Sequence, residues 1–169
     1  CDLAARNVLY RVESGRYISK ISDFGLATTG SESDPAKLGK GESFPVRWSA
    51  PEVLSVGVCT PASDVWSFGV LLWELWTLGK HPFEGIKNSD IYEHVVAGNR
   101  LERPIECPDD IFEIMRICWR EKPDQRPKFE KILEMLLMCT FPCQSPVQGY
   151  PASRYQRQCD VTSKVCSIL

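Results

Sequence analysis

Three short segments carry the side chains whose types and spacing could do chemistry. They are D-L-A-A-R-N at residues 2–7, D-F-G at residues 23–25 and A-P-E at residues 50–52. The first two supply carboxylates and a carboxamide, whose oxygens are suitable ligands for a hard cation. Each segment is a weak signal by itself; an Asp followed by Phe and Gly, for example, is more often a turn than a metal ligand. Their joint occurrence in one chain is the stronger observation.

These segments stand in the order and approximate spacing of the protein-kinase signature set, and the chain resembles the protein tyrosine kinase family. D-V-W-S-F-G at residues 64–69 and C-W-R-E-K-P-D-Q-R-P at residues 118–127 also fit that family. The resemblance covers residues 1–137. It implies a mainly α, protein-kinase-like fold, namely the helical C-terminal lobe of a kinase domain with a small β-hairpin and with the N-terminal lobe missing.

The resemblance implies a role for each polar side chain in the first two segments. Asp2 resembles the catalytic base that accepts the proton of the substrate hydroxyl, and Arg6 resembles the residue that orients it. Asn7 and Asp23 resemble the pair that holds Mg²⁺ against the phosphates of ATP. Phosphoryl transfer needs such groups, because charge spreads over the transferred phosphate while the nucleophile must be aimed in line. The expected cofactors are therefore ATP and Mg²⁺.

Two further features favour tyrosine as the phosphate acceptor. Serine/threonine kinases typically carry a lysine two residues after the catalytic Asp, whereas this chain has Ala4 there and carries its cation at Arg6. The segment P-V-R-W resembles the tyrosine-kinase substrate platform, which here consists of Pro45, Val46, Arg47 and Trp48. By resemblance, this platform supports the longer phenolic side chain as it reaches the base.

Three charged residues resemble structural positions of the family. Glu52 and Arg126 resemble a buried ion pair that ties the substrate segment to the helical body. Loss of one member of such a pair leaves an uncompensated buried charge. Asp64 resembles the residue that accepts hydrogen bonds from the catalytic-loop backbone, and a carboxylate favoured by the helix dipole at a helix start is the alternative.

The predicted activation segment, residues 23–52, departs from the family pattern. It contains no tyrosine, and Cys1 stands where the family usually has an Arg that receives the activating phosphate. This pattern predicts a kinase that does not use tyrosine autophosphorylation of this segment as a switch. A pseudokinase or scaffold module is the alternative function, and the intact residues Asp2, Asn7 and Asp23 argue against it.

The elements that must position these residues follow from turn signals and periodicity. Residues 8–10 and 17–21 predict two strands of a hairpin, which would bring residues 2–7 and 23–25 close together. Residues 26–44 predict a long loop. Apolar spacings of three and four predict a helix after an N-cap at Ser63, and further helices over residues 89–97, 110–121 and 128–138.

Composition bounds the class of protein. The chain has 169 residues, enough for one domain with a substantial core, and a net charge of −2, which argues against nucleic acid as a partner. The sequence contains no glycine-rich phosphate loop and no V-A-I-K-like strand, which belong to the N-terminal lobe in the family. We therefore expect a fragment that is truncated at the catalytic loop and is inactive alone. Its parent would be a signalling kinase of the cytoplasm or, if the parent is a receptor, this part of it would lie on the cytoplasmic side of the plasma membrane.

Residues 138–169 predict a flexible tail that contains cysteines, because periodicity ends there. Tyr150 and Tyr155 could become docking sites for SH2 domains after phosphorylation. The terminal C-S-I-L at residues 166–169 has three alternatives: no function, a PDZ-domain ligand, or a geranylgeranylated Cys166. The expected partners are protein substrates with tyrosine. Membrane association would come through that lipid or through a missing upstream region.

Overall fold

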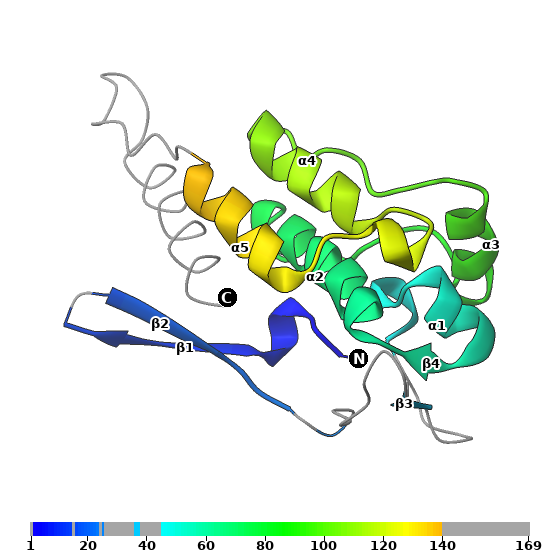
Figure 1. Ribbon diagram of the computed structural model, residues 1–169, viewed down its shortest axis with the longest axis horizontal. Helices are drawn as coiled ribbons and strands as arrows, with labels where there is room; N and C mark the ends of the chain where they lie inside the picture. The colour runs from blue at the N-terminus through cyan, green and yellow to red at the C-terminus, as the bar shows by residue number, and fades with distance from the viewer. Residues whose placement is uncertain (1, 15, 24, 26–35, 38–44, 140–169) are drawn as a thin grey trace.

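Within the described residues, helices packed around one central helix form the body of the fold, and a two-stranded hairpin projects from them (Figure 1). The computed structural model describes residues 2–14, 16–23, 25, 36–37 and 45–139. Its elements, with η for a 3₁₀ helix, are in chain order η1 (Ala5–Asn7), β1 (Val8–Glu13), β2 (Arg16–Ile21), β3 (Ala36–Lys37), η2 (Val46–Trp48), α1 (Pro51–Val56), β4 (Val58–Cys59), α2 (Pro61–Trp76), η3 (Asn88–Asp90), α3 (Ile91–Val96), α4 (Asp109–Cys118), η4 (Pro123–Gln125) and α5 (Phe129–Met138). The mainly α fold with a small hairpin confirms the predicted class.

Strands β1 and β2 form the predicted hairpin. They pair antiparallel over their whole length, from Val8 opposite Ile21 to Glu13 opposite Arg16. Both strands are longer than the sequence predicts, because pairing continues through polar residues up to the turn. The hairpin stands away from the helices in Figure 1, and its first strand exposes large apolar side chains, namely Leu9, Tyr10 and Val12. Its base joins the two segments that carry the candidate catalytic residues.

Helix α2 is the centre of the fold. It begins at Pro61 with Thr60 as N-cap, and the side chains of Thr60 and Ser63 bond each other's backbone amides in a capping box. The predicted cap at Ser63 was therefore wrong by one helical turn, because Pro61 occupies the first helical position, where its missing N–H is harmless. Eleven of its sixteen residues are buried, so neighbouring elements surround the helix nearly completely.

A glycine lets α2 approach α4 closely. A Cβ atom at Gly69 would lie 2.6 Å from Trp119 Nε1 and 2.9 Å from Cys118 Cβ, so the contact has no room for a methyl group. We predict that Gly69→Ala lowers the free energy of unfolding by about 1–3 kcal/mol, because overpacking outweighs the better helix propensity of Ala. Urea unfolding measures this change. Ser55→Ala on the exposed side of α1 is the control, and a Gly69→Ala protein as stable as wild type would contradict the prediction.

The three later helices agree with the sequence prediction to within a few residues. Helix α4 ends at Cys118, earlier than predicted, because the chain turns into the Pro123 segment. The sequence did not predict α1 or the short β3–β4 pair, although Pro51 at the start of α1 and Gly57 with φ 66° at its end are ordinary boundary signals. Within the described residues, no helix has the length and apolarity needed to cross a bilayer.

Several predictions of the sequence fall on residues outside this description. They are the departure at Cys1, residues 26–35 and 38–44 of the activation segment, and the tail from residue 140 onward. The division into a lobe over residues 1–137 and a tail over residues 138–169 stays a prediction.

Candidate active site

The carboxylate of Asp2 is held from both sides by residues of the same loop. Arg6, in η1, forms an ion pair with Oδ1, and the Nδ2 atom of Asn7 donates to Oδ2 at 2.8 Å. The same Nδ2 atom also donates to the backbone carbonyl of Asp2 at 2.8 Å. The side chain of Asp2 keeps 18% of its surface exposed, so solvent or a substrate can reach it. The loop therefore presents one oriented, accessible carboxylate.

The carboxamide of Asn7 has a fixed orientation. Asn7 is buried, with 7% of its surface exposed, and only its nitrogen can donate to the carboxylate and carbonyl of Asp2. Its oxygen is consequently the end turned away from these two acceptors. An oriented carboxamide oxygen beside a carboxylate is a suitable ligand for a hard cation.

Asp23 lies next to Asn7 along the base of the hairpin. The backbone amide of Ser22 donates to the carbonyl of Asn7 at 2.7 Å, and the Ser22 hydroxyl donates to the same carbonyl at 3.0 Å. Asp23 follows with φ 59°, a left-handed conformation that Asp tolerates better than most residues, and its Oδ1 accepts from the amide of Gly25 at 3.1 Å. Within the described residues, the carboxylate of Asp23 makes no hydrogen bond to Asp2 or Asn7, and the backbone bonds of Ser22 bring the two segments together.

The predicted platform is anchored to the helical body through Arg47. Its guanidinium donates four hydrogen bonds to the loop before α3, where the acceptors are the carbonyls of Pro82, Phe83 and Ile86 and the side chain of Asn88. These bonds use four of the five N–H donors of the guanidinium. Arg47 therefore fixes residues 45–48 against the helical body.

If residues 45–48 form the tyrosine-kinase substrate platform that the sequence predicts, we expect Arg47→Lys in the whole protein to raise the KM for a tyrosine peptide by about 10-fold, equal to ~1.4 kcal/mol. A lysine ammonium cannot match the planar fork, so some of the loop carbonyls would lose their donor and the platform would loosen. Steady-state kinetics with varied peptide measures this change. The KM for ATP serves as the internal control, and an equal rise in both constants would contradict a role confined to the platform.

Trp48 connects the platform to the catalytic loop. It is largely buried, with 9% of its surface exposed, and its ring lies under the guanidinium of Arg6 at 4.6 Å from the ring centroid. Its Nε1 atom donates to Oε2 of Glu74 at 2.8 Å, and its carbonyl accepts from the hydroxyl of Ser67 at 2.8 Å. The predicted substrate platform and the predicted catalytic loop thus share one contact surface.

Glu74 is a residue of this site that the sequence analysis did not select. It lies on α2 with 6% of its surface exposed and also accepts the backbone N–H of Ala5 at 3.0 Å. The sequence does contain a signal for it, because Glu74 is the one charged residue in the apolar run over residues 65–78. A carboxylate on a buried helix requires hydrogen-bond partners.

Glu52 and Arg126 form the predicted ion pair. The Arg126 side chain is fully buried and binds both carboxylate oxygens of Glu52, at 2.6 and 2.9 Å. It also donates to three backbone carbonyls, those of Ala62, Arg120 and Glu121. Asp64 lies in the first turn of α2 and has a partner, but its predicted bonds to the catalytic-loop backbone stay a prediction.

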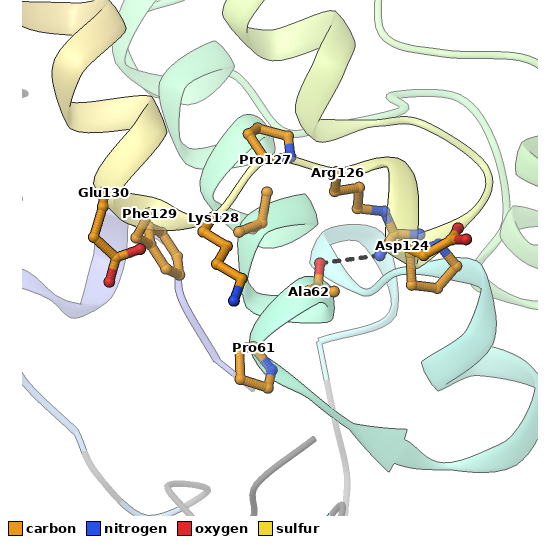
Figure 2. A pocket seen from close by; sticks show the side chains of 10 residues that line it. Pro61, Ala62, Asp124, Arg126, Pro127, Lys128, Phe129 and Glu130 are labelled. Carbon is orange, nitrogen blue, oxygen red and sulfur yellow. Dashed lines mark hydrogen bonds between the residues drawn. The ribbon is translucent and has the colours of Figure 1, made fainter. Parts of the chain in front are cut away.

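A cavity of about 710 Å³ lies between the start of α2, η4 and the start of α5 (Figure 2). Figure 2 shows Arg126 on one side of it, donating to the carbonyl of Ala62 at 3.0 Å, with Phe129 and Lys128 on the other side. Its walls combine apolar and charged side chains. None of the candidate catalytic residues lines this cavity, so it is separate from the Asp2 site.

The buried thiols of Cys107 and Cys118 are poor nucleophiles at neutral pH. Burial raises the pKa of Cys118 to about 12, and burial likewise raises the pKa of Cys107 to about 12. Because the thiolate is the nucleophilic form, both side chains are protonated at neutral pH. They belong to the core, and the candidate chemistry is that of the carboxylates.

Comparison with known proteins identifies relatives of this arrangement. Residues 1–136 match the family model described as protein tyrosine and serine/threonine kinase. The chain is 49% identical over 138 residues to the human (Homo sapiens) proto-oncogene tyrosine-protein kinase ROS, an alignment covering 80% of this chain and 6% of that protein. It is 40% identical over 139 residues to the Mus musculus leukocyte tyrosine kinase receptor, covering 82% of this chain and 16% of the receptor. It is 44% identical over 135 residues to the Xenopus laevis insulin-like growth factor 1 receptor, covering 80% of this chain and 10% of the receptor.

Proposed function

Because this chain belongs to the protein tyrosine kinase family, we propose that it supplies the catalytic loop and substrate platform of an ATP-dependent protein tyrosine kinase. The reaction is transfer of the γ-phosphate of ATP to a tyrosine hydroxyl of a protein substrate. The chain spans only 6–16% of the length of the relatives compared above, so the activity is proposed for the whole protein. The observation that carries the proposal is the oriented carboxylate of Asp2 beside Arg6 and the Trp48 platform.

Asp2 acts as the base in this proposal. A tyrosine hydroxyl has a pKa of about 10 in water, so a positioned carboxylate assists by accepting its proton as the bond to phosphorus forms. The ion pair with Arg6 and the bond from Asn7 hold the carboxylate in one orientation. Arg6 is partly exposed and can also orient the incoming hydroxyl.

Asn7 and Asp23 are the residues proposed to hold the metal ion. Both side chains offer oxygen atoms as metal ligands. The Asn7 nitrogen donates its hydrogen bonds to Asp2, so the Asn7 carboxamide oxygen stays available, and the two side chains fit the ligand chemistry of Mg²⁺. When bound with ATP, Mg²⁺ supplies neutralisation of the charge on the phosphates. The Ser22 bonds to the carbonyl of Asn7 keep the two segments together while this happens.

The platform supports tyrosine as the acceptor residue. Trp48 and Arg47 fix residues 45–48 against α2 and the loop before α3, at a site that also contacts Arg6. A rigid platform beside the base suits a long, planar side chain, because its hydroxyl must arrive from a greater distance than that of serine. Ala4, which is fully buried, adds no cation to this surface.

Partners and location follow from the same proposal. The substrates are proteins with accessible tyrosines, and Tyr150 or Tyr155 could recruit an SH2 domain once phosphorylated. Two of the relatives are named as receptors, which supports a receptor parent with this segment on the cytoplasmic side of the plasma membrane over a kinase free in the cytoplasm. At residues 166–169, mass spectrometry of the C-terminal peptide separates a prenylated Cys166 from an intact end that a PDZ domain could bind.

Phosphoamino-acid analysis tests the proposed function. The whole protein is incubated with ATP, Mg²⁺ and either a poly-Glu-Tyr polymer or a serine/threonine substrate, and phosphotyrosine is the expected product. Phosphoserine alone would contradict the assignment of tyrosine. ATP binding without transfer to either substrate would favour the scaffold alternative.

A further inference from the structure

We propose that Glu74 is a positioning residue for catalysis, which acts with Trp48 to set Arg6 against the base Asp2. This inference rests on the proposed function, and it adds residues that neither bind ATP nor accept the substrate proton. The side chain of Glu74 is 69 residues from Ala5 and 26 residues from Trp48 in sequence, yet it bonds both. It therefore joins two segments that must meet for the reaction to occur.

One carboxylate oxygen makes both contacts. Oε2 of Glu74 accepts the backbone N–H of Ala5 at 3.0 Å and the indole Nε1–H of Trp48 at 2.8 Å. Ala5 is the first residue of η1, directly before Arg6. Since a buried carboxylate accepts strong charge-assisted bonds, this oxygen fixes the backbone from which the Arg6 side chain starts.

Trp48 completes the connection from its other side. Its ring carries the Arg6 guanidinium at 4.6 Å from the centroid, and Arg6 in turn pairs with Asp2. The contacts thus form a closed circuit through Glu74, Trp48, Arg6 and Ala5. A change at Glu74 reaches the base by two routes, the Ala5 backbone and the Trp48 ring.

Helix α2 provides the rigid support that such a circuit needs. Ser67 lies seven residues before Glu74, which places both on one face of the helix, and its hydroxyl donates to the Trp48 carbonyl at 2.8 Å. The helix therefore holds the backbone of Trp48 through Ser67 and the side chain of Trp48 through Glu74, two turns later. Rigid elements hold reacting groups more accurately than loops do, so this placement suits a positioning role.

The experiment compares substitutions in the whole protein. Glu74→Ala removes the acceptor, Glu74→Gln keeps an oxygen that can accept both bonds, and Trp48→Phe keeps a ring but removes the N–H donor. Leu136→Ala, at a fully buried position of α5, is the matched control for lost stability without a change in the circuit. Each protein is measured for kcat and both KM values, for its melting temperature, and for amide hydrogen exchange over residues 2–7 and 45–50.

We expect Glu74→Ala to lower kcat for peptide phosphorylation by about 10- to 100-fold, because a small misplacement of a catalytic group is costly. The KM for ATP should stay near wild type, Glu74→Gln should restore most of kcat, and exchange should become faster over residues 2–7 and 45–50. Leu136→Ala should lower the melting temperature and leave kcat unchanged. If Glu74→Ala does not fold, Trp48→Phe carries the test with a loss in the same direction.

Wild-type kcat in folded Glu74→Ala or in Trp48→Phe would overturn the inference. An equal loss of kcat in Leu136→Ala would overturn it as well, because the effect would then be one of stability. If wild type itself transfers no phosphate, the proposed function fails, and hydrogen exchange decides the inference separately. Unchanged exchange over residues 2–7 in Glu74→Ala would then reject it, and faster exchange would support it.

Discussion

Asp2→Asn is expected to lower kcat for tyrosine phosphorylation by about 10²- to 10⁴-fold, the range that a positioned general base contributes. The amide oxygen of Asn can still accept the bond from Asn7, so the loop should keep its shape. It cannot take up the proton of the substrate hydroxyl, and it ends the ion pair with Arg6. Initial rates of phosphotyrosine formation at saturating ATP and peptide measure the loss.

Two controls accompany this experiment. The melting temperature and circular dichroism of the Asp2→Asn protein should match wild type, since the substitution is isosteric. Asp110→Asn, at an exposed carboxylate in the first turn of α4, should leave kcat unchanged. If Asp2→Asn kept most of the wild-type rate, Asp2 would not be the base and the proposed mechanism would be wrong.

Arg126→Ala is expected to lower the free energy of unfolding by about 3–5 kcal/mol, because it leaves Glu52, whose side chain is 24% exposed, without its partner and also removes buried bonds to the backbone. The substitution removes both bonds to Glu52, three donors to backbone carbonyls and the guanidinium packed 5.1 Å from the centre of the Trp66 ring. Urea or thermal unfolding measures the change.

An exposed ion pair offers the matched control. Arg116 pairs with Glu113 on α4 with both side chains more than half exposed, so Arg116→Ala should change stability by at most about 1 kcal/mol. Replacing both partners, Glu52→Leu with Arg126→Met, should recover part of the loss, because no charge is then left unpaired. Recovery stays incomplete, since the carbonyls of Arg120 and Glu121 lose the donor that Arg126 provides. An Arg126→Ala protein as stable as wild type would contradict the structural role of the ion pair between Arg126 and Glu52.

The sequence by itself determined the family, the hairpin and the larger helices. These features depend on local information: motifs of fixed spacing at residues 2–7 and 23–25, alternation and turn signals around Gly15, and apolar spacing along α2. The ion pair of Glu52 and Arg126 was also predicted, although only through resemblance to the family. Helix ends were less certain from sequence, as the start of α2 at Pro61 shows, because capping depends on which neighbouring polar group faces the free amides.

Only the tertiary structure decided the contacts between distant segments. Periodicity indicates that Glu74 interrupts an apolar face, but not that its oxygen meets Ala5 and Trp48 from two different loops. Resemblance to the family likewise assigns Arg47 to the platform, but it does not reveal that the loop before α3 occupies four of its donors. The close approach at Gly69 depends on where α4 crosses α2. In each case the physical reason is the same: a hydrogen-bond partner or a packing neighbour is set by chain segments that only folding brings together, and local sequence carries no record of them.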